Sequence, residues 1–418
     1  MKGDRDRKAN RRCVVLILDG LGDQPIPALG QQTPLEAART PRLDRLAFAG
    51  RCGLVDPIAP GVVPNTHTGV GILFGLRPRQ RELLRRGPVE AAGAGLHLNP
   101  GDVAFRANFA TLERAGTGLR VRDRRAGRVI GDAPEFAKAI EEIDLDNGIT
   151  ARFRTTDQHR GALVFSGPGL GAALSDTDPG DGSMPTALKP CEPLHPGSAA
   201  TADRVNQYVQ MAHGILAGHP LNSRRKADGK LPVTGVITRG AGAWFDLDSV
   251  LDERQIPAAL VVGCNTVAGL GRVFGLHIVR RSGFTADAST DLEGKLKAAR
   301  DTLADFPLVY VHIKATDLFS HDLQPEGKRD FIERLDRAMV VLEDSGAAIA
   351  LASDHTTDSN KGAHTSDPVP VLLCAPDIPD ARDDGDPPNF GETACRSGSL
   401  GRLDGHGFLL EILRYLDS

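Results

Sequence analysis

The sequence lacks several patterns that would each point to a particular class of protein. Charge of one sign is not in excess, since 50 Lys and Arg stand against 54 Asp and Glu. This balance leaves no electrostatic footprint for nucleic acid or for an anionic membrane surface. No stretch approaches the roughly 20 apolar residues that span a membrane, and the first apolar run, at 13–18, is too short for a signal peptide. We therefore expect a cytoplasmic protein that binds neither nucleic acid nor a membrane.

Cysteine is scarce and scattered. The six cysteines include no C-x-x-C pair, so we expect neither a zinc ribbon nor a disulfide framework, and buried reduced thiols are the default. What the chain does have is length, with 418 residues of which 40% are apolar. A chain of this length exceeds a single compact core and favours a large domain with a second, smaller one. The pattern does not predict an oligomeric state.

Strand-like and helix-like segments alternate along most of the chain. Short apolar runs rich in β-branched residues predict buried strands, and apolar residues at helical spacing predict helices. The strands are expected at 14–18, 233–238, 258–262, 308–313, 347–353 and 369–374, and the helices at 41–49, 66–75, 202–217 and 326–344. This alternation favours an α/β fold with a doubly wound sheet.

The middle of the chain has a different pattern. From about residue 102 to 178, short alternating segments lie between charged turns, which is typical of a smaller α+β unit. We therefore predict a core formed by residues 13–95 and 195–418 and an inserted domain at 96–194. Residues 1–12 are highly charged and are expected to form a disordered tail, and the Asp-, Pro- and Gly-rich segment 375–398 is expected to be a surface loop.

Acidic and imidazole side chains follow several of the predicted strands. In an open α/β sheet the carboxyl ends of the strands line the ligand crevice, so these side chains should meet at one edge. They are Asp19, Asp317, His321, Asp354, His355 and His364. Each one alone could be a turn or a helix cap, but together they form a ligand set that suits zinc or manganese, with magnesium as a further option. Two such ions can bind both the entering and the leaving oxygen of a phosphoryl group.

A series of short motifs covers nearly the whole chain in order. They are VVLILDGLGD at 14–23, TPLEAA at 33–38, TPRLD at 40–44, GPVEA at 87–91, GDVAFRANF at 101–109, DRRAGR at 123–128, HRG at 159–161, DTDP at 176–179, RGAG at 239–242, HIKATD at 312–317, HD at 321–322, SDHT at 353–356 and HTSDPVP at 364–370. In these motifs the sequence resembles the archaeal-type, cofactor-independent phosphoglycerate mutases of the alkaline phosphatase superfamily. The resemblance implies an alkaline-phosphatase-like core with a smaller inserted α+β domain.

The resemblance also implies roles for individual residues. One metal would be held by Asp19, Asp354 and His355 together with the nucleophile, and the other by Asp317, His321 and His364, while Lys314 would contribute to catalysis. Substrate binding would fall to side chains of the inserted domain and its flanks, namely Asp102, Arg106, Asn108, Asp123, Arg124, Arg125, Arg128, His159, Arg160 and Arg239. Guanidinium groups suit the carboxylate and phosphate oxygens of a small phosphorylated or phosphonylated carboxylic acid. The Asp123–Arg125 stretch could equally form a solvated turn with a local ion pair.

The segment around the expected nucleophile departs from the family. The related mutases carry a serine in a Gly-Ser-Asp-Thr-Ala-His type segment, whereas this chain has PNTHTG at 64–69, which places Thr66 at the nucleophile position. A metal-activated threonine hydroxyl can perform the same attack. Thr68 is a local competitor for that role. His67 stands where the relatives carry Asp. It either contacts an anionic substrate group or acts as a general acid, or it faces solvent in the first turn of a helix.

Three functions remain open on this basis. The first is phosphoryl transfer through a phosphothreonine, as in a phosphoglycerate mutase. The second keeps the metals and the nucleophile but uses another donor, as in a phosphatase, a phosphodiesterase, or a transferase that moves a phosphonate or phosphoryl group from an activated, nucleotide-like donor to glycerate. The third is a non-catalytic relative, which the retention of all six metal-ligand candidates argues against.

Overall fold

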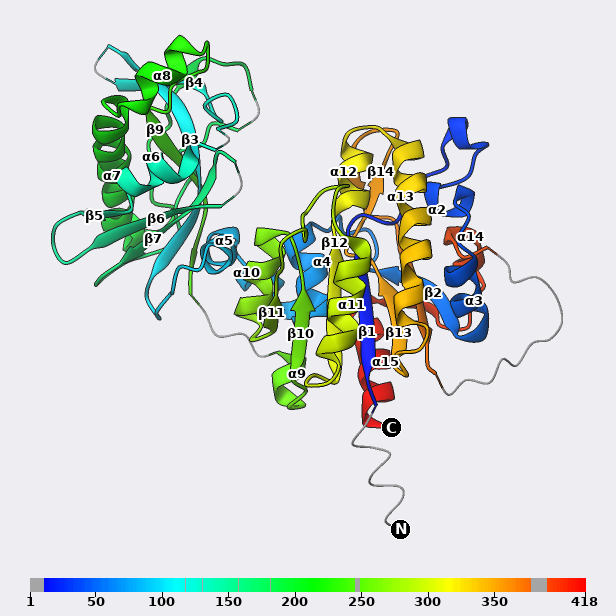
Figure 1. Ribbon diagram of the computed structural model, residues 1–418. Coiled ribbons are helices and arrows are strands. Elements are labelled where there is room, and N and C mark those ends of the chain that lie inside the picture. The colour runs from blue at the N-terminus through cyan, green and yellow to red at the C-terminus, as the bar shows by residue number, and fades with distance from the viewer. Residues whose placement is uncertain are drawn as a thin grey trace. The chain divides into compact units, whose positions relative to one another are not determined.

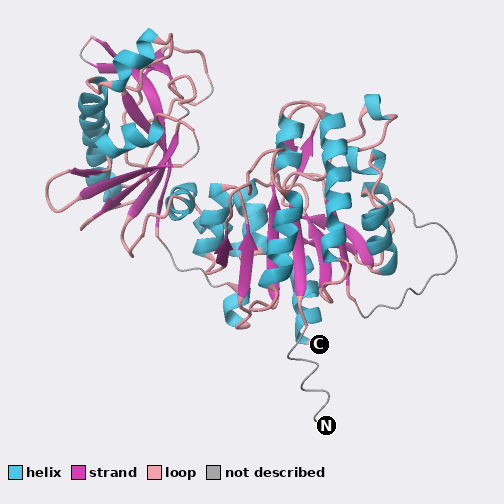
Figure 2. Ribbon diagram, in the orientation of Figure 1, coloured by secondary structure: helices cyan, strands magenta, loops and turns pink. Residues whose placement is uncertain are grey.

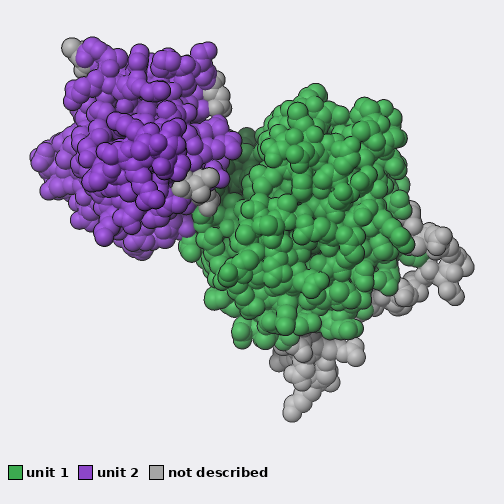
Figure 3. Space-filling view, turned by 45° about the horizontal axis from the view of Figure 1, so that its top comes forward, with its two compact units in different colours: residues 1–81, 247–418 green, residues 82–246 purple. Residues whose placement is uncertain are grey.

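Two units make up the chain in the computed structural model, which describes residues 11–116, 118–129, 131–156, 158–180, 182–244, 249–376 and 389–418. Unit 1 consists of residues 1–81 and 247–418, and unit 2 of residues 82–246 (Figure 3). A 3-10 helix, η2 (Pro78–Leu83), lies where the chain passes from unit 1 into unit 2. Among the helices of the described residues, none is both long and apolar enough to cross a membrane.

A mostly parallel sheet forms the centre of unit 1. Its strand order is β11 (His277–Val279), β10 (Ala258–Val261), β12 (Leu308–Ile313), β1 (Cys13–Leu18), β13 (Ala348–Ala352), β16 (Val369–Cys374), β2 (Arg51–Asp56) and β17 (Gly401–Asp404). The strands from β11 to β13 are parallel, and β16 runs antiparallel to both of its neighbours. Strand β1 is buried at every position, as expected for a central strand covered on both faces.

Helices cover both faces of this sheet (Figures 1 and 2). One face carries α3 (Pro41–Ala49), α11 (Leu292–Thr302) and α13 (Pro325–Ala338), whose side chains share a core with Val14, Leu16 and Leu18. The other face carries α4 (Thr66–Leu73), α10 (Asn265–Val273) and α15 (Gly405–Asp417), with Tyr310 of β12 donating to the carbonyl of Leu73 at 2.7 Å. This is the doubly wound arrangement that the sequence predicts.

Shorter elements complete unit 1. They are η1 (Pro27–Leu29), α2 (Pro34–Ala37), α9 (Val250–Glu253), α12 (Ala315–His321), η4 (Met339–Leu342), α14 (Glu392–Arg396) and the hairpin β14 (Thr356–Asp358) with β15 (Ala363–Thr365). Helix α14 lies inside the segment 375–398 that the sequence analysis took for a loop. Its buried Cys395 packs into the core, which anchors this part of an otherwise polar segment. Residues 377–388 of that segment lie outside the described residues.

Unit 2 is built on an antiparallel sheet. Its order is β5 (Glu142–Asp144), β6 (Thr150–Thr155), β7 (Arg160–Ser166), β3 (Val103–Ala115), β4 (Gly118–Asp123) and β8 (Thr186–Ala187), and β9 (Gly235–Ala243) pairs with β3. The helical segments are α5 (Arg86–Gly93), α6 (Ala133–Ala139), η3 (Pro196–Ser198), α7 (Ala199–Ala217) and α8 (Leu221–Ala227). A large apolar core joins one face of the sheet to α6 and α7, and α5 packs on β3, β7 and β9.

The structure draws the domain boundary differently from the sequence, which placed the insertion at 96–194. The helix expected at 202–217 and the strand expected at 233–238 belong to unit 2 and not to the core. Strand β9 pairs with β3 along most of its length, from Gly235 to Ala243, and α7 packs on β9. A helix followed by a strand looks alike in either unit, so the pattern alone did not show which sheet the strand would join.

The first described residues of the chain contact the C-terminal helix within unit 1. The tail predicted at 1–12 lies outside the described residues, apart from Arg11 and Arg12. Arg11 donates a hydrogen bond to the carbonyl of Tyr415 at 3.2 Å, and its guanidinium lies 4.9 Å from the centre of the Tyr415 ring. The beginning of the described chain is thus tied to the C-terminal helix α15.

Candidate active site

The carboxyl ends of three adjacent parallel strands bring the predicted ligands together. Asp19 follows β1, Asp354 and His355 follow β13, and Asp317 lies in the first turn of α12, directly after β12. His321 ends the same helix, and His364 comes from β15 of the hairpin. Because β12, β1 and β13 are parallel neighbours, their ends meet at one edge of the sheet, as the sequence analysis expected.

Asp19, Asp354 and His355 form one group whose ligand atoms all lie within 4.8 Å of one another. His355 Nε2 lies 3.4 Å from Asp19 Oδ1 and 3.2 Å from Asp354 Oδ2. Asp354 Oδ1 accepts a hydrogen bond from the backbone N–H of Gly20. Its other oxygen, Oδ2, is buried without a hydrogen-bond partner among the described residues. A bound cation would supply the partner that this buried carboxylate oxygen lacks.

Asp317, His355 and His364 form a second group within the same limit. Asp317 Oδ1 lies 3.5 Å from His364 Nε2 and 3.3 Å from His321 Nε2. By resemblance to the family, Asp317, His321 and His364 were expected to hold one metal. The structure keeps His321 beside the other two, but it also brings His355 into the group, so His355 lies between the two ligand sets. All six predicted ligands are therefore gathered in one place.

The hydrogen bonds of the three imidazoles fix which nitrogen faces the centre of the site. His321 Nδ1 lies 2.7 Å from the carbonyl of Gly362, and His364 Nδ1 lies 3.1 Å from the carbonyl of Pro64. A carbonyl only accepts, so both Nδ1 atoms carry the proton. His355 Nδ1 meets Thr357 Oγ1, whose own proton goes to Asp317 Oδ1. Each ring thus turns Nε2 towards the other ligands, and this is the nitrogen that binds a metal once it is unprotonated.

Lys314 lies between the two carboxylates at the centre of the cluster. Its ammonium donates to both oxygens of Asp19 at 3.1 Å and to Asp317 Oδ2 at 2.7 Å. Burial alone would raise the pKa of each carboxyl, but Lys314 and the neighbouring imidazoles hold the pKa of Asp19 and of Asp317 below the usual range. Burial would likewise lower the pKa of His355, yet Asp354 and Asp19 raise it to about 10. The site therefore favours positive charge at its centre.

Two residues that the sequence analysis did not single out complete the surroundings. His312 of β12 is buried, and its Nε2 lies 3.0 Å from Asp19 Oδ2. Thr357 links His355 to Asp317, as described above. His312 lies five residues before Asp317 and Thr357 two residues after His355, and this nearness in the chain was the only signal that could have found them.

Thr66 places its hydroxyl at this cluster, with Oγ1 3.4 Å from His355 Nε2. It is the first residue of α4, whose N-cap is Asn65. The competitor Thr68 has a different role, because its Oγ1 donates to Asn65 and accepts from the Asn65 N–H in a capping box. His67, the second residue of the helix, is half-buried. Of the two threonines, only Thr66 faces the ligand cluster.

Gly69 explains how α4 comes so close to the end of β13. A Cβ atom at this position would lie 2.2 Å from the carbonyl oxygen of Asp354. Any side chain would therefore push the helix away from the ligand-bearing segment. The glycine of the PNTHTG segment thus allows Thr66 to lie close to Asp354 and His355.

Unit 2 gathers a second group of predicted residues on one face of its sheet. Arg106 of β3 stands opposite Arg239 of β9, and Asn108 of β3 stands opposite Arg160 of β7. Paired residues on neighbouring strands point to the same face, so these four side chains share it. Arg86, at the start of α5, reaches the same region, since Glu90 Oε1 lies 3.3 Å from Arg86 Nε and 3.8 Å from Arg106 Nη1. We call Arg86, Arg106, Arg160 and Arg239 the arginine cluster.

The electrostatics of the arginine cluster suit a bound anion. Burial, together with the neighbouring Arg86, Arg160 and Arg239, lowers the pKa of Arg106 to about 9. Burial and the surrounding arginines, among them Arg160, Arg125 and Arg128, lower the pKa of His159 to about 4, so this imidazole is neutral at pH 7. Polar atoms of three residues, Arg106 Nε, Asn108 Oδ1 and His159 Nδ1, are buried without a hydrogen-bond partner among the described residues. Such atoms are available to a polar ligand.

Three other predicted substrate-binding residues have structural partners. Arg124 makes a bidentate pair with buried Asp178, with Nη2 2.8 Å from Oδ2. Asp123 Oδ1 accepts from the N–H groups of Arg125 and Gly127, which is the turn that the sequence analysis kept as an alternative. Asp102 caps the turn before β3 by accepting from the N–H of Asn99. Arg86 is the opposite case, because it was not among the predicted substrate-binding residues and yet belongs to the arginine cluster.

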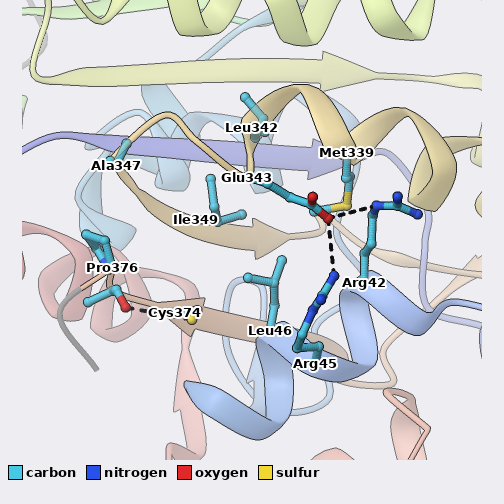
Figure 4. Close-up of a pocket in the computed structure, with 12 residues that line it drawn as sticks. Arg42, Arg45, Leu46, Met339, Leu342, Glu343, Ala347, Ile349, Cys374 and Pro376 are labelled. Atoms are coloured by element: carbon cyan, nitrogen blue, oxygen red, sulfur yellow. Dashed lines mark hydrogen bonds and ion pairs between the residues drawn. The ribbon is translucent and has the colours of Figure 1, made fainter. Parts of the chain in front are cut away.

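A cavity of about 320 Å³ in unit 1 lies away from these residues (Figure 4). Arg42 and Arg45 both approach Glu343 there, at 3.0 and 3.2 Å, beside Leu46 and Ile349. The cavity is bounded by the beginning of β13 and the end of the antiparallel β16. It therefore lies at the end of the sheet opposite to the carboxylates and imidazoles, and none of the predicted site residues lines it.

The core and its ligand cluster define the class of protein, a metal-dependent enzyme with an alkaline-phosphatase-like fold. The family model described as 2,3-bisphosphoglycerate-independent phosphoglycerate mutase matches residues 47–222. A protein of that name from Ignicoccus hospitalis is 41% identical over 97% of each chain, and one from Archaeoglobus fulgidus is 40% identical over 95% of this chain and 96% of its own. The chain belongs to the 2,3-bisphosphoglycerate-independent phosphoglycerate mutase family, whose members are metal-dependent isomerases.

Solved structures agree with this assignment. A protein from Pyrococcus horikoshii is 29% identical and superposes with a TM-score of 0.80 over 98% of each chain. The cofactor-independent phosphoglycerate mutase from Thermoplasma acidophilum is 33% identical, with a TM-score of 0.71 over 98% of this chain and 100% of its own. The family and the fold that the sequence motifs implied are thereby confirmed.

Proposed function

We propose that the chain moves the phosphoryl group of a small phosphorylated hydroxy acid, such as phosphoglycerate, from one oxygen of that molecule to another. The observation that carries this proposal is the position of Thr66, whose hydroxyl meets the ligand cluster while Thr68 is bound up in the helix cap. The names of the relatives support phosphoglycerate as the substrate. The family's isomerase activity supports transfer within one molecule over hydrolysis.

Two divalent ions, of manganese or zinc with magnesium as a further option, are part of the proposal. The donor set fits them, because carboxylate oxygens and imidazole Nε2 atoms converge in two overlapping groups and Asp354 Oδ2 accepts no hydrogen bond from the described residues. Bound ions would lower the pKa of the Thr66 hydroxyl and offset the negative charge of the phosphoryl oxygens.

The chain's own residues would act in two successive transfers of the phosphoryl group. The Thr66 hydroxyl loses its proton and Oγ1 attacks phosphorus, the bond from phosphorus to the substrate oxygen breaks, that oxygen takes up a proton to become a hydroxyl, and a phosphothreonine forms. The neighbouring hydroxyl of the glycerate then loses its proton and attacks phosphorus, the bond from phosphorus to Thr66 Oγ1 breaks, and Oγ1 takes up a proton, so that the proton count is restored. Lys314, whose ammonium donates to Asp19 and Asp317, would contact the phosphoryl oxygens when bound ions take up these carboxylates. The arginine cluster would bind the carboxylate, with neutral His159 and Asn108 beside it.

A second candidate keeps Thr66 and the ions but takes the group from another donor. It would be a phosphatase, a phosphodiesterase, or a transferase that moves a phosphonate or phosphoryl group from an activated donor to glycerate. The observation that favours it is the altered segment at the nucleophile, where a half-buried His67 replaces the Asp of the resembling mutases. An imidazole beside the transferred group could contact an additional anionic part of the donor.

One assay separates these candidates. Manganese-loaded protein is incubated with 3-phosphoglycerate, and phosphorus NMR follows 2-phosphoglycerate and free phosphate, with Thr66→Ala as the control. Isomerisation without phosphate release, absent from Thr66→Ala, is the expected result. Phosphate release alone would indicate a phosphatase. No turnover with metal bound would exclude the mutase and direct the search to phosphodiester and phosphonate donors.

A further inference from the structure

Glu90 is an acidic side chain placed inside the arginine cluster of unit 2. Its Oε1 lies between Arg86 Nε, at 3.3 Å, and Arg106 Nη1, at 3.8 Å. Only 5% of the Glu90 side chain is exposed. A buried carboxylate within a group of side chains that is proposed to bind an anion calls for an explanation, because its charge repels the same anion.

The backbone holds Glu90 firmly in this place. It lies on α5, and a Cβ atom at Gly87 of this helix would come within 2.0 Å of the carbonyl oxygen of Ala104 and 2.9 Å of that of Gly240. The helix therefore rests directly on the backbone of β3 and β9. An apolar cluster that includes Ala91 and Ala104 continues the contact beneath it. This close packing of α5 on the two strands places the carboxylate of Glu90 beside Arg86 and Arg106.

Electrostatic repulsion acts between the guanidinium groups of the arginine cluster. Burial and the proximity of Arg239 and Arg160 lower the pKa of Arg86, and the same kind of surroundings lower that of Arg106. Like charges this close repel one another, and long arginine side chains have many rotamers in which to relieve the repulsion. The carboxylate of Glu90 opposes this repulsion because it accepts a hydrogen bond from Arg86 and attracts Arg106 as an ion pair. The same negative charge weakens the attraction of the cluster for an anionic substrate.

We infer that Glu90 is a positioning residue, which holds the guanidinium groups of Arg86 and Arg106 in the directions in which they meet the substrate's anionic group. The inference rests on the proposed function, since it takes the arginine cluster as the substrate's binding region. The inference predicts in which direction anion binding changes when the carboxylate of Glu90 is removed. If net charge alone mattered, removal of the carboxylate would strengthen anion binding, whereas loss of positioning weakens it.

Glu90→Gln is the decisive variant, because the amide keeps the shape of the side chain and removes its charge. We expect the KM for 3-phosphoglycerate to rise about tenfold with kcat within about twofold of the wild type, since the loss falls on binding. Glu90→Asp, which keeps the charge on a shorter side chain, should recover part of this loss. A purely structural defect would instead lower the amount of folded protein and leave the KM of the remainder unchanged.

Glu113→Gln is a matched control in the same unit. Glu113, like Glu90, forms ion pairs with two arginines, and it accepts hydrogen bonds from Arg120 and Arg122 at 2.8 and 2.9 Å. These lie on the exposed side of β4 and belong to no predicted site. This variant removes the same kind of shared carboxylate, and its KM should match that of the wild type.

Calorimetric titration of the metal-free, full-length protein with inorganic phosphate gives a readout that does not depend on turnover. Weaker binding by Glu90→Gln, with Glu113→Gln unchanged, supports the positioning role. Equal or tighter binding by Glu90→Gln, or no phosphate binding by the wild type, overturns it. If the wild type binds phosphate but does not isomerise phosphoglycerate, the proposed function fails while the titration still decides the role of Glu90.

Discussion

The Nε2 atoms of His321 and His364 lie 3.2 Å apart, although both rings carry their proton on the opposite nitrogen. Each Nδ1–H is bound to a carbonyl, of Gly362 and of Pro64 respectively. Two lone pairs at this distance repel each other unless positive charge lies beside them. The carboxylate of Asp317 completes the surroundings, and together these groups describe a place for a cation.

We therefore expect the purified protein to bind two divalent ions per chain and to lose its activity when a chelator removes them. His364→Ala should retain about one ion and lose activity by about 100-fold or more, because even partners outside the ligands contribute 10–100-fold. Elemental analysis and the isomerase assay check both points. Retention of two ions and of full activity by His364→Ala would contradict the assignment.

Alanine variants of Thr66 and Thr68 should distinguish a loss of catalysis from a loss of stability. Thr66→Ala should abolish the phosphorylated protein, which mass spectrometry detects after incubation with phosphoglycerate, and should leave the unfolding free energy nearly unchanged. Thr68→Ala should still be phosphorylated but should lower the free energy of unfolding by about 1 kcal/mol, because it breaks the capping box of α4. A phosphorylated Thr66→Ala protein would transfer the nucleophile role to another hydroxyl.

Gly69→Ala should be destabilising despite the small size of the added group. The methyl would meet the Asp354 carbonyl at 2.2 Å, and relief of such overpacking typically costs about 1–3 kcal/mol. We also expect lower activity, since α4 would move away from His355. Gly214→Ala is the matched control, because Gly214 lies in helix α7 with nothing within 4 Å of an added Cβ. That change should stabilise the protein by about 0.5–1 kcal/mol, and chemical denaturation measures both.

Glu392 should make stability depend on pH near neutrality. It accepts hydrogen bonds from the hydroxyl of Thr33 and the N–H of Asp23, but burial, with Glu36 nearby, raises its pKa from 4.5 to about 7. The folded protein then holds a proton that the unfolded chain has lost, so stability is full below pH 4.5 and declines as the pH rises to about 7.

Glu392→Gln removes this titration. The unfolding free energy of the variant, relative to that of the wild type, should increase by roughly 3 kcal/mol between these two pH values and stay constant above them. Thermal and chemical unfolding across this range measure the difference. A difference that does not change with pH would show that the Glu392 carboxyl titrates alike in both states.

Much of the site could be predicted from the sequence because it depends on strand ends. Asp19, Asp317, Asp354 and His355 each stand close behind a continuous apolar run, and parallel strands necessarily bring such positions to one edge. The bounds of the central strands were likewise set by short buried runs. The choice between Thr66 and Thr68 was different, since it depended on which hydroxyl a helix cap would use, and only the hydrogen bonds of Asn65 decide that.

The insertion shows where the sequence was insufficient. Arg86 and Arg239 lie outside the range 96–194 and yet join Arg106, because α5 and β9 pack on β3. Long-range pairing of this kind leaves no local periodicity to read. Arg124 shows the reverse case, since a motif placed it among the substrate ligands while a partner far along the chain, Asp178, takes up its guanidinium.

Strand order in unit 1 also has a consequence for synthesis. Strand β1 emerges first from the ribosome, but its neighbours β12 and β13 begin only at residues 308 and 348. Unit 2 is one continuous segment that ends at residue 246, so it can fold before β12 and β13 have been synthesised. During that time both edges of β1 lack their partner strands. Unpaired apolar strands are prone to aggregation. We therefore expect the nascent chain to depend on chaperones for β1 until translation has passed β13, and slow translation beyond residue 246 to lower the yield of folded protein.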